Sequence, residues 1–127
     1  APSDKNGNPV MQANYGAKML DLYAPGVDVY STYMGDTYKK GSGESMASSV
    51  VAGVAALLKT YFPKLTGTQI RDILLKSVTS RKGVKVEKGI RINDRPSQDL
   101  FLFDDLCISG GIVNAYQAVL EAEKISK

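Results

Sequence analysis

The residues with the clearest chemical potential lie at 41–49, where the sequence reads Gly-Ser-Gly-Glu-Ser-Met-Ala-Ser-Ser. A serine where a polar loop becomes a helix can simply cap the helix, which is the structural alternative for Ser45. It can also act as a nucleophile, because the first helical turn leaves backbone N–H groups unpaired and carries about half a positive charge. The N–H of such a serine stabilises the oxyanion that forms in acyl transfer. From these residues alone both alternatives stay open, and we carry Ser45 forward as the candidate nucleophile, with Ser45 and Glu44 as the candidate oxyanion site at the helix N-terminus.

Two neighbours of Ser45 bear on this chemistry. Glu44 directly precedes it, and a carboxylate in the first helical turn favours folding by about 0.3–1 kcal/mol. Near a forming oxyanion the same charge is repulsive, by about 4 kcal/mol at a separation of about 4 Å and an effective dielectric near 20. The direction of the Glu44 side chain therefore decides between an active and a degenerate site. Ser42, in the loop before Ser45, is predicted to cap the helix.

The chain offers few groups that could act as the general base. It contains no histidine, so a Ser-His-Asp triad cannot be completed from these 127 residues. Lys39 and Lys40 are the alternative bases, in a Ser-Lys arrangement. Cys107, the single cysteine, can form neither an internal disulfide nor a zinc cluster and is expected to be a buried packing residue. We expect no metal and no other cofactor.

Length and composition describe one globular domain or a large piece of one. A chain of 127 residues, 43% of them hydrophobic, can bury about two-thirds of its unfolded surface. The net charge is +3, and the most basic stretch, 81–95, includes Glu87 and Asp94 rather than aromatic residues, so we expect no nucleic-acid partner. No apolar run reaches the roughly 20 residues of a membrane span, and residues 1–9 lack the features of a signal peptide. We expect the chain to begin after any export signal.

The elements that must position Ser45 can be read from the pattern of apolar residues. Residues 19–24 form an apolar-rich run stopped by Pro25-Gly26, and residues 27–32 alternate between apolar and polar, so both predict short strands, which we expect to be adjacent. Asn6-Gly7 is predicted to form a turn with positive φ. Residues 46–58 are apolar on nearly every face, which predicts a buried helix.

The second half of the chain predicts two further helices. Thr66 and Gln69 have the spacing of a capping box, and Asn114 and Gln117 have the same spacing near the C-terminus. The helix after Thr66 is predicted to lie on the surface of the protein, because its apolar residues fall on about one face. These residues are Ile70, Ile73, Leu74 and Val78. Between these helices, the apolar residues of 84–92 suggest a hairpin around Lys88-Gly89.

Segments around the serine form a recognisable set. Residues 43–53 read Gly-Glu-Ser-Met-Ala-Ser-Ser-Val-Val-Ala-Gly, and residues 20–32 read Leu-Asp-Leu-Tyr-Ala-Pro-Gly-Val-Asp-Val-Tyr-Ser-Thr. With Asn-Tyr-Gly at 14–16, they resemble the serine motif and the upstream segments of the subtilases, the subtilisin-like serine proteases. The chain departs from the family pattern at Glu44, where Thr is usual, and at Ser49, where Pro is usual.

Downstream residues extend the resemblance over most of the chain. Tyr61-Phe62-Pro63 and Gln69-Ile70 resemble the segments that follow the serine helix in the family, and residues 110–115, Gly-Gly-Ile-Val-Asn-Ala, resemble its closing segment. The match is weakest at 79–106. Several matching segments in the right order are far more specific than a single short serine motif.

The resemblance implies a fold, an extent and a reaction. It implies an α/β fold: the C-terminal portion of the subtilisin-like three-layer architecture, a mostly parallel sheet with helices, incomplete in this chain. Residues 1–127 would be the C-terminal part of the catalytic domain, with a variable insertion at about 79–109. Peptide bonds would be hydrolysed through an acyl-enzyme on Ser45. The triad Asp and His and the oxyanion Asn would lie outside the chain, since the family order is Asp, His, Ser. Asp21 does not match the triad Asp, and Asn14 does not match the oxyanion Asn.

Several expectations follow from this resemblance. The partners would be protein or peptide substrates, and the location extracellular or the cell envelope. The chain alone would be inactive because it holds a nucleophile without a base. It would also self-associate, since the apolar helix at 46–58 and the strands at 20–29 would lack the layers that cover them in a complete domain. The alternative function is a non-catalytic or degenerate subtilase-like binding or structural module.

Overall fold

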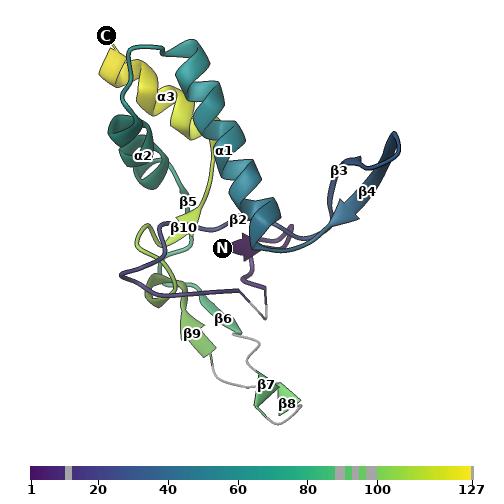
Figure 1. Cartoon of the computed structure of the whole chain (residues 1–127). Helices are drawn as coiled ribbons and strands as arrows, with labels where there is room; N and C mark the ends of the chain where they lie inside the picture. Colours follow the sequence, from purple (N-terminus) through teal and green to yellow (C-terminus); the bar gives the residue numbers. More distant parts are fainter. Residues whose placement is uncertain (11–12, 88–90, 93–94, 97–99, 127) are drawn as a thin grey trace.

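Figure 1 presents the computed structural model of the chain, which describes residues 1–10, 13–87, 91–92, 95–96 and 100–126. The helices are α1 (Glu44–Tyr61), α2 (Gly67–Lys76) and α3 (Ala115–Ser126), with a 3-10 turn at Phe103–Asp105. The strands are β1 (Pro2–Ser3), β2 (Ala24–Pro25), β3 (Val29–Tyr33), β4 (Thr37–Gly41), β5 (Thr79–Ser80), β6 (Lys85–Glu87), β7 (Arg91–Ile92), β8 (Arg95–Pro96), β9 (Leu100–Leu102) and β10 (Gly111–Ile112).

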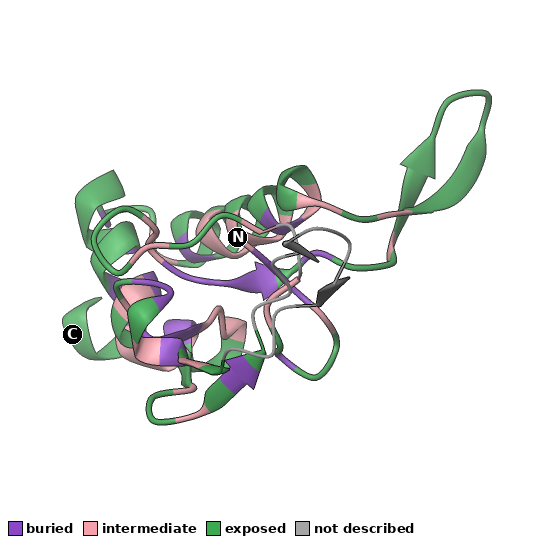
Figure 2. Cartoon of the chain, turned by 90° about the horizontal axis from the view of Figure 1, so that it is seen from below, coloured by how far each residue is buried: buried purple, intermediate pink, exposed green. Residues whose placement is uncertain are grey.

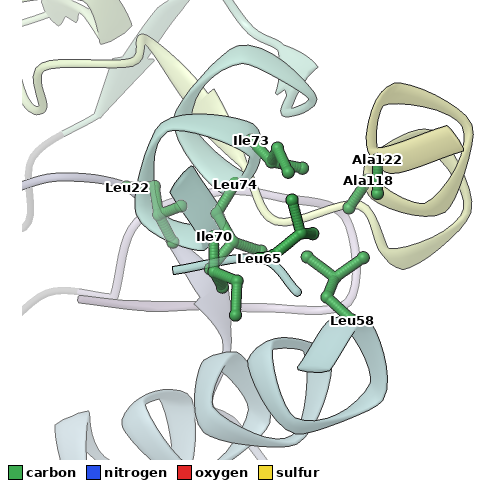
Figure 3. Packing of buried hydrophobic residues seen from close by; sticks show 8 residues of the cluster. All are labelled: Leu22, Leu58, Leu65, Ile70, Ile73, Leu74, Ala118 and Ala122. Carbon is green, nitrogen blue, oxygen red and sulfur yellow. The ribbon is translucent and has the colours of Figure 1, made fainter. Parts of the chain in front are cut away.

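The helices meet around one apolar cluster, drawn in Figure 3. Leu58 enters it from α1, Ile73 from α2 and Ala118 from α3, and each of these side chains is fully buried. Burying a side chain the size of leucine or isoleucine stabilises the fold by about 1.5–3 kcal/mol. This cluster fixes the C-terminal half of α1 against the other two helices. The whole cluster comprises Leu22, Leu58, Leu65, Ile70, Ile73, Leu74, Ala118 and Ala122.

Helices α2 and α3 begin at the capping residues that the sequence predicts. The Thr66 side chain accepts a hydrogen bond from the Gln69 main-chain N–H, and the Gln69 side chain accepts one from the Thr66 N–H, so the predicted capping box is confirmed. At α3 the Asn114 side chain accepts from the Gln117 N–H at 3.0 Å. Gly7 has the expected positive φ, at 78°.

The strands before Ser45 differ from the prediction. Residues 19–24 do not form one strand: only Ala24 belongs to β2, which pairs in parallel with β1, and Tyr23 makes a parallel bridge to Ile112 of β10. The run is apolar because Leu22 packs into the cluster between the helices and Leu20 packs against a second cluster, which is described below. β3 pairs with β4 in an antiparallel hairpin instead of with β2, so the predicted adjacency is wrong. Figure 1 shows this hairpin projecting from the rest of the chain.

A second apolar cluster lies below the helices and contains Tyr23, Val86, Phe103, Leu106 and Cys107. The rings of Tyr23 and Phe103 pack edge to face, with centroids 5.2 Å apart. Cys107 is buried there, as predicted. The hairpin predicted around Lys88-Gly89 is replaced by other pairings, β6 with β9 and β7 with β8, and residues 88–90 lie outside the described residues.

The helix predicted to be buried is largely exposed. Of its residues only Ala47 and Leu58 are buried, and Figure 2 shows much of α1 in the colours of exposed and intermediate residues. The residues of α1 are apolar on nearly every face, but the described part of the chain packs against only some of those faces. Within that part, no helix combines the length and the apolar character needed to cross a membrane.

Candidate active site

Ser45 is the second residue of α1 and its side chain is exposed. The N-cap residue is Gly43, which has no side chain with which to cap the helix, so Ser45 does not act as the cap. The cap predicted at Ser42 is also wrong. The Ser42 hydroxyl instead accepts a hydrogen bond from the Asp28 main-chain N–H at 2.9 Å, which ties the serine loop to the start of the β3–β4 hairpin.

Two glycines allow the backbone to approach the start of α1 closely. Gly43 has φ 143° and ψ 179°, a combination that is essentially restricted to glycine. Its N–H donates to the carbonyl of Gly26 at 2.8 Å. A Cβ on Gly26 would lie 2.5 Å from the Cβ of Pro2 and 3.0 Å from the Gly43 carbonyl, so any side chain there would force the loop away. The loop after β2 thus sets where α1 begins.

The Ser45 main chain is bonded from within the helix. The Ser49 hydroxyl donates to the Ser45 carbonyl at 2.9 Å, so the residue that stands in place of the family's proline adds a hydrogen bond to the candidate nucleophile. A proline at this position would remove a helical N–H and crowd the same carbonyl. The first-turn N–H groups of α1 point away from the helix, where an oxyanion would be stabilised.

Glu44 is turned toward Asn14. Its Oε1 accepts from the Asn14 main-chain N–H at 2.9 Å, and its Oε2 accepts from the Asn14 side-chain amide at 2.8 Å. Neither orientation considered from the sequence, into solvent or into the oxyanion site, describes this contact. Sequence reasoning did not identify Asn14 as a partner of Glu44, and the only signal was that both residues lie in segments that match the same family.

The lysines weighed as alternative bases lie on the exposed β4 strand. The Lys39 ammonium sits 4.4 Å from the centre of the Tyr33 ring, in a cation–π contact. Lys40 is opposite Tyr30 in the hairpin register. Over the described residues, the structure records no hydrogen bond from either ammonium to Ser45, so nothing here favours a Ser-Lys pair.

An open groove of about 920 Å³ runs along α1 beside the candidate site. Glu44 and Ser48 line it near the start of the helix, and its walls further along are apolar, formed by residues such as Val51, Ile70 and Leu74. One side of α1 therefore borders this groove. Figure 2 shows the same helix from below.

Comparison with known proteins matches these segments to one family. Residues 3–92 match the family described as the Subtilase family. Subtilisin BL of Lederbergia lenta is 47% identical over 78 residues, which cover 61% of this chain and 29% of that protein. An alkaline protease of Shouchella clausii is 47% identical over the same length, covering 61% of this chain and 20% of the relative. The chain thus spans less than a third of the length of these relatives.

Solved structures have the same fold. One described as proteases from Pseudoalteromonas arctica is 31% identical with a TM-score of 0.69, and the match covers 96% of this chain and 34% of the other. The Patellamide maturation protease PatA is 26% identical with a TM-score of 0.67, covering 97% of this chain and 42% of its own. The α/β fold expected from the sequence is therefore confirmed.

Proposed function

The chain belongs to the subtilase family, and we propose that it is the C-terminal part of the catalytic domain of a serine endopeptidase, with Ser45 as the nucleophile. The observation that carries this proposal is the place of Ser45: exposed, second in α1, after a glycine cap that leaves the first helical turn without a side-chain partner at the cap. Names of the relatives, subtilisins and alkaline proteases, support the reaction class.

In the proposed reaction, the Ser45 hydroxyl attacks the carbonyl carbon of a peptide bond as a base takes its proton. The carbonyl oxygen becomes an oxyanion, to which the Ser45 N–H donates a hydrogen bond. The base then gives the proton to the leaving amine, whose departure leaves an acyl group on Ser45, and water attacks this acyl group and releases it as the acid. A histidine base cannot come from this chain, which contains no histidine, so the proposal assigns the base and its Asp partner to sequence outside these residues.

The remaining parts of the proposal concern the extent and setting of the domain. Residues 1–127 form the C-terminal portion of the domain, with a variable insertion at about 79–109, and the 127-residue chain alone is inactive. The substrate is a protein or peptide. The location, extracellular or at the cell envelope, rests on the family resemblance.

The experiment compares serine variants of the intact protein on an unstructured protein substrate such as casein. We expect Ser45→Ala to abolish turnover, because alanine has no hydroxyl to attack the peptide bond and carry the acyl group. Thr60→Ala removes another exposed hydroxyl of the same helix, far from its start, and is expected to leave turnover unchanged. Full activity of Ser45→Ala with an unaltered circular dichroism spectrum would contradict the proposal. Absence of any turnover in the unmodified intact protein would favour the alternative, a non-catalytic subtilase-like module.

A further inference from the structure

The contact between Glu44 and Asn14 joins the start of α1 to a segment 30 residues earlier. Both carboxylate oxygens accept from the same residue, one from its main-chain N–H and one from its side-chain amide, at 2.9 and 2.8 Å. Hydrogen bonds to an ionised carboxylate are shorter and about twice as strong as neutral ones. Two of them on one residue fix the orientation of the carboxylate as well as its position.

Asn14 is itself anchored to the core on its other side. Its carbonyl accepts a hydrogen bond from the Tyr23 hydroxyl at 3.2 Å. Only 1% of Tyr23 is exposed, and its ring packs edge to face with that of the fully buried Phe103. The contacts from Phe103 to Tyr23, Asn14 and Glu44 therefore link the second apolar cluster to the first turn of α1.

Other hydrogen bonds near the start of α1 come from the loop before it, where the Gly43 N–H donates to the Gly26 carbonyl and the Ser42 hydroxyl accepts from the Asp28 N–H. The N-cap glycine offers no side chain, and the Ser45 side chain is exposed. Glu44 supplies a side-chain contact of another kind, since it ties the first turn to Asn14 and, among the described residues, accepts from no N–H of α1. Its two N–H partners also hold the carboxylate at Asn14, which keeps it from turning toward an oxyanion at Ser45.

We infer that Glu44 is a positioning residue for Ser45, acting through Asn14. The Glu44–Asn14 contact holds the first turn of α1 so that the hydroxyl and N–H of Ser45 keep one fixed place for the attack and for the oxyanion. This inference rests on the proposed function. Small misplacements of a reacting group lower the rate of the chemical step, whereas binding of the remote parts of a substrate is unaffected.

The test uses the intact protein and exchanges the hydrogen-bonding groups. Asn14→Asp keeps the main-chain N–H but replaces the side-chain amide with a carboxylate, which cannot donate, so the bond to Glu44 Oε2 is lost. We expect kcat to fall about three- to tenfold with KM unchanged. Combining Glu44→Gln with Asn14→Asp restores a donor opposite an acceptor and is expected to recover kcat to within about twofold. Glu121→Gln, which affects an exposed ion pair on α3, is the matched control.

Two outcomes would overturn the inference. One is an unchanged kcat for Asn14→Asp, and the other is a fall in kcat that the swapped pair does not recover although it folds like the parent. Hydrogen exchange offers a readout besides activity: Glu44→Ala should speed exchange at the Asn14 main-chain N–H, and unchanged exchange would also count against the contact. Failure of the proposed function looks different, since it appears as full turnover in Ser45→Ala.

Discussion

Gly43 offers a sharp test of how the backbone starts the serine helix. Its φ and ψ, 143° and 179°, lie in a region where a residue with a Cβ is strained by about 1–3 kcal/mol. A Cβ built on Gly43 meets no atom within 4 Å, so Gly43→Ala adds a methyl group to open space. The whole cost therefore comes from backbone strain. We expect Gly43→Ala to lower the free energy of unfolding of the 127-residue chain by about 1–3 kcal/mol.

Gly53 provides a matched control in the same helix. It is exposed inside α1, has ordinary helical geometry, and its added Cβ likewise meets no atom within 4 Å. Gly53→Ala is expected to raise the free energy of unfolding by about 0.5–1 kcal/mol, because alanine loses less backbone entropy than glycine on entering a helix. The same methyl group should thus act with opposite signs at two positions of one helix.

The assay is urea unfolding of both variants and the parent chain, followed by circular dichroism. The midpoint should fall for Gly43→Ala and rise for Gly53→Ala, with the slope of the transition unchanged. A neutral or stabilising Gly43→Ala would refute the account of the helix start, since it would mean that the backbone at 43 does not require glycine. Equal destabilisation by both variants would mean that the environment of α1 differs from the one described.

Three further predictions concern the rest of the chain. Thr66→Ala should lower the free energy of unfolding by about 0.5–2 kcal/mol through loss of the capping box, while Thr60→Ala, inside α1, should not; equal midpoints in urea for the two would contradict this. Burial raises the pKa of Tyr23 above its ordinary value of 10.0, so only the unfolded state ionises just above that pH; stability measured by urea unfolding should fall as pH rises above 10, and less steeply in Tyr23→Phe. The 127-residue chain should self-associate through the groove along α1 or strand edges near residues 20–29, and a stable monomer that binds no hydrophobic dye across a sedimentation dilution series would contradict this.

Features set by residues close in sequence were predicted well. The capping box at Thr66 depends on groups three residues apart, and the start of a helix near Ser45 follows from the change from a polar loop to an apolar run. The serine motif itself identified the family that the comparisons report. The main error among the helices concerned α1, whose apolar faces predict burial that the described residues only partly supply.

Features set by distant residues were missed. The strand Thr37–Gly41 has no apolar period, because most of its side chains face solvent, and it forms only because β3 lies opposite it. The run at 19–24 is rich in apolar residues like a strand, although those residues serve two clusters. The orientation of Glu44 depends on Asn14, 30 residues away, and no local pattern in the sequence encodes that contact.

The central claim, that Ser45 is the nucleophile of a site completed by sequence outside this chain, is tested most directly by a fluorophosphonate probe. The intact protein and the isolated 127-residue chain are treated side by side, and the labelled residue is located by peptide mass spectrometry. The account predicts stoichiometric labelling at Ser45 in the intact protein and none in the isolated chain. Labelling of the intact protein at another serine, or of the isolated chain at Ser45, would contradict it.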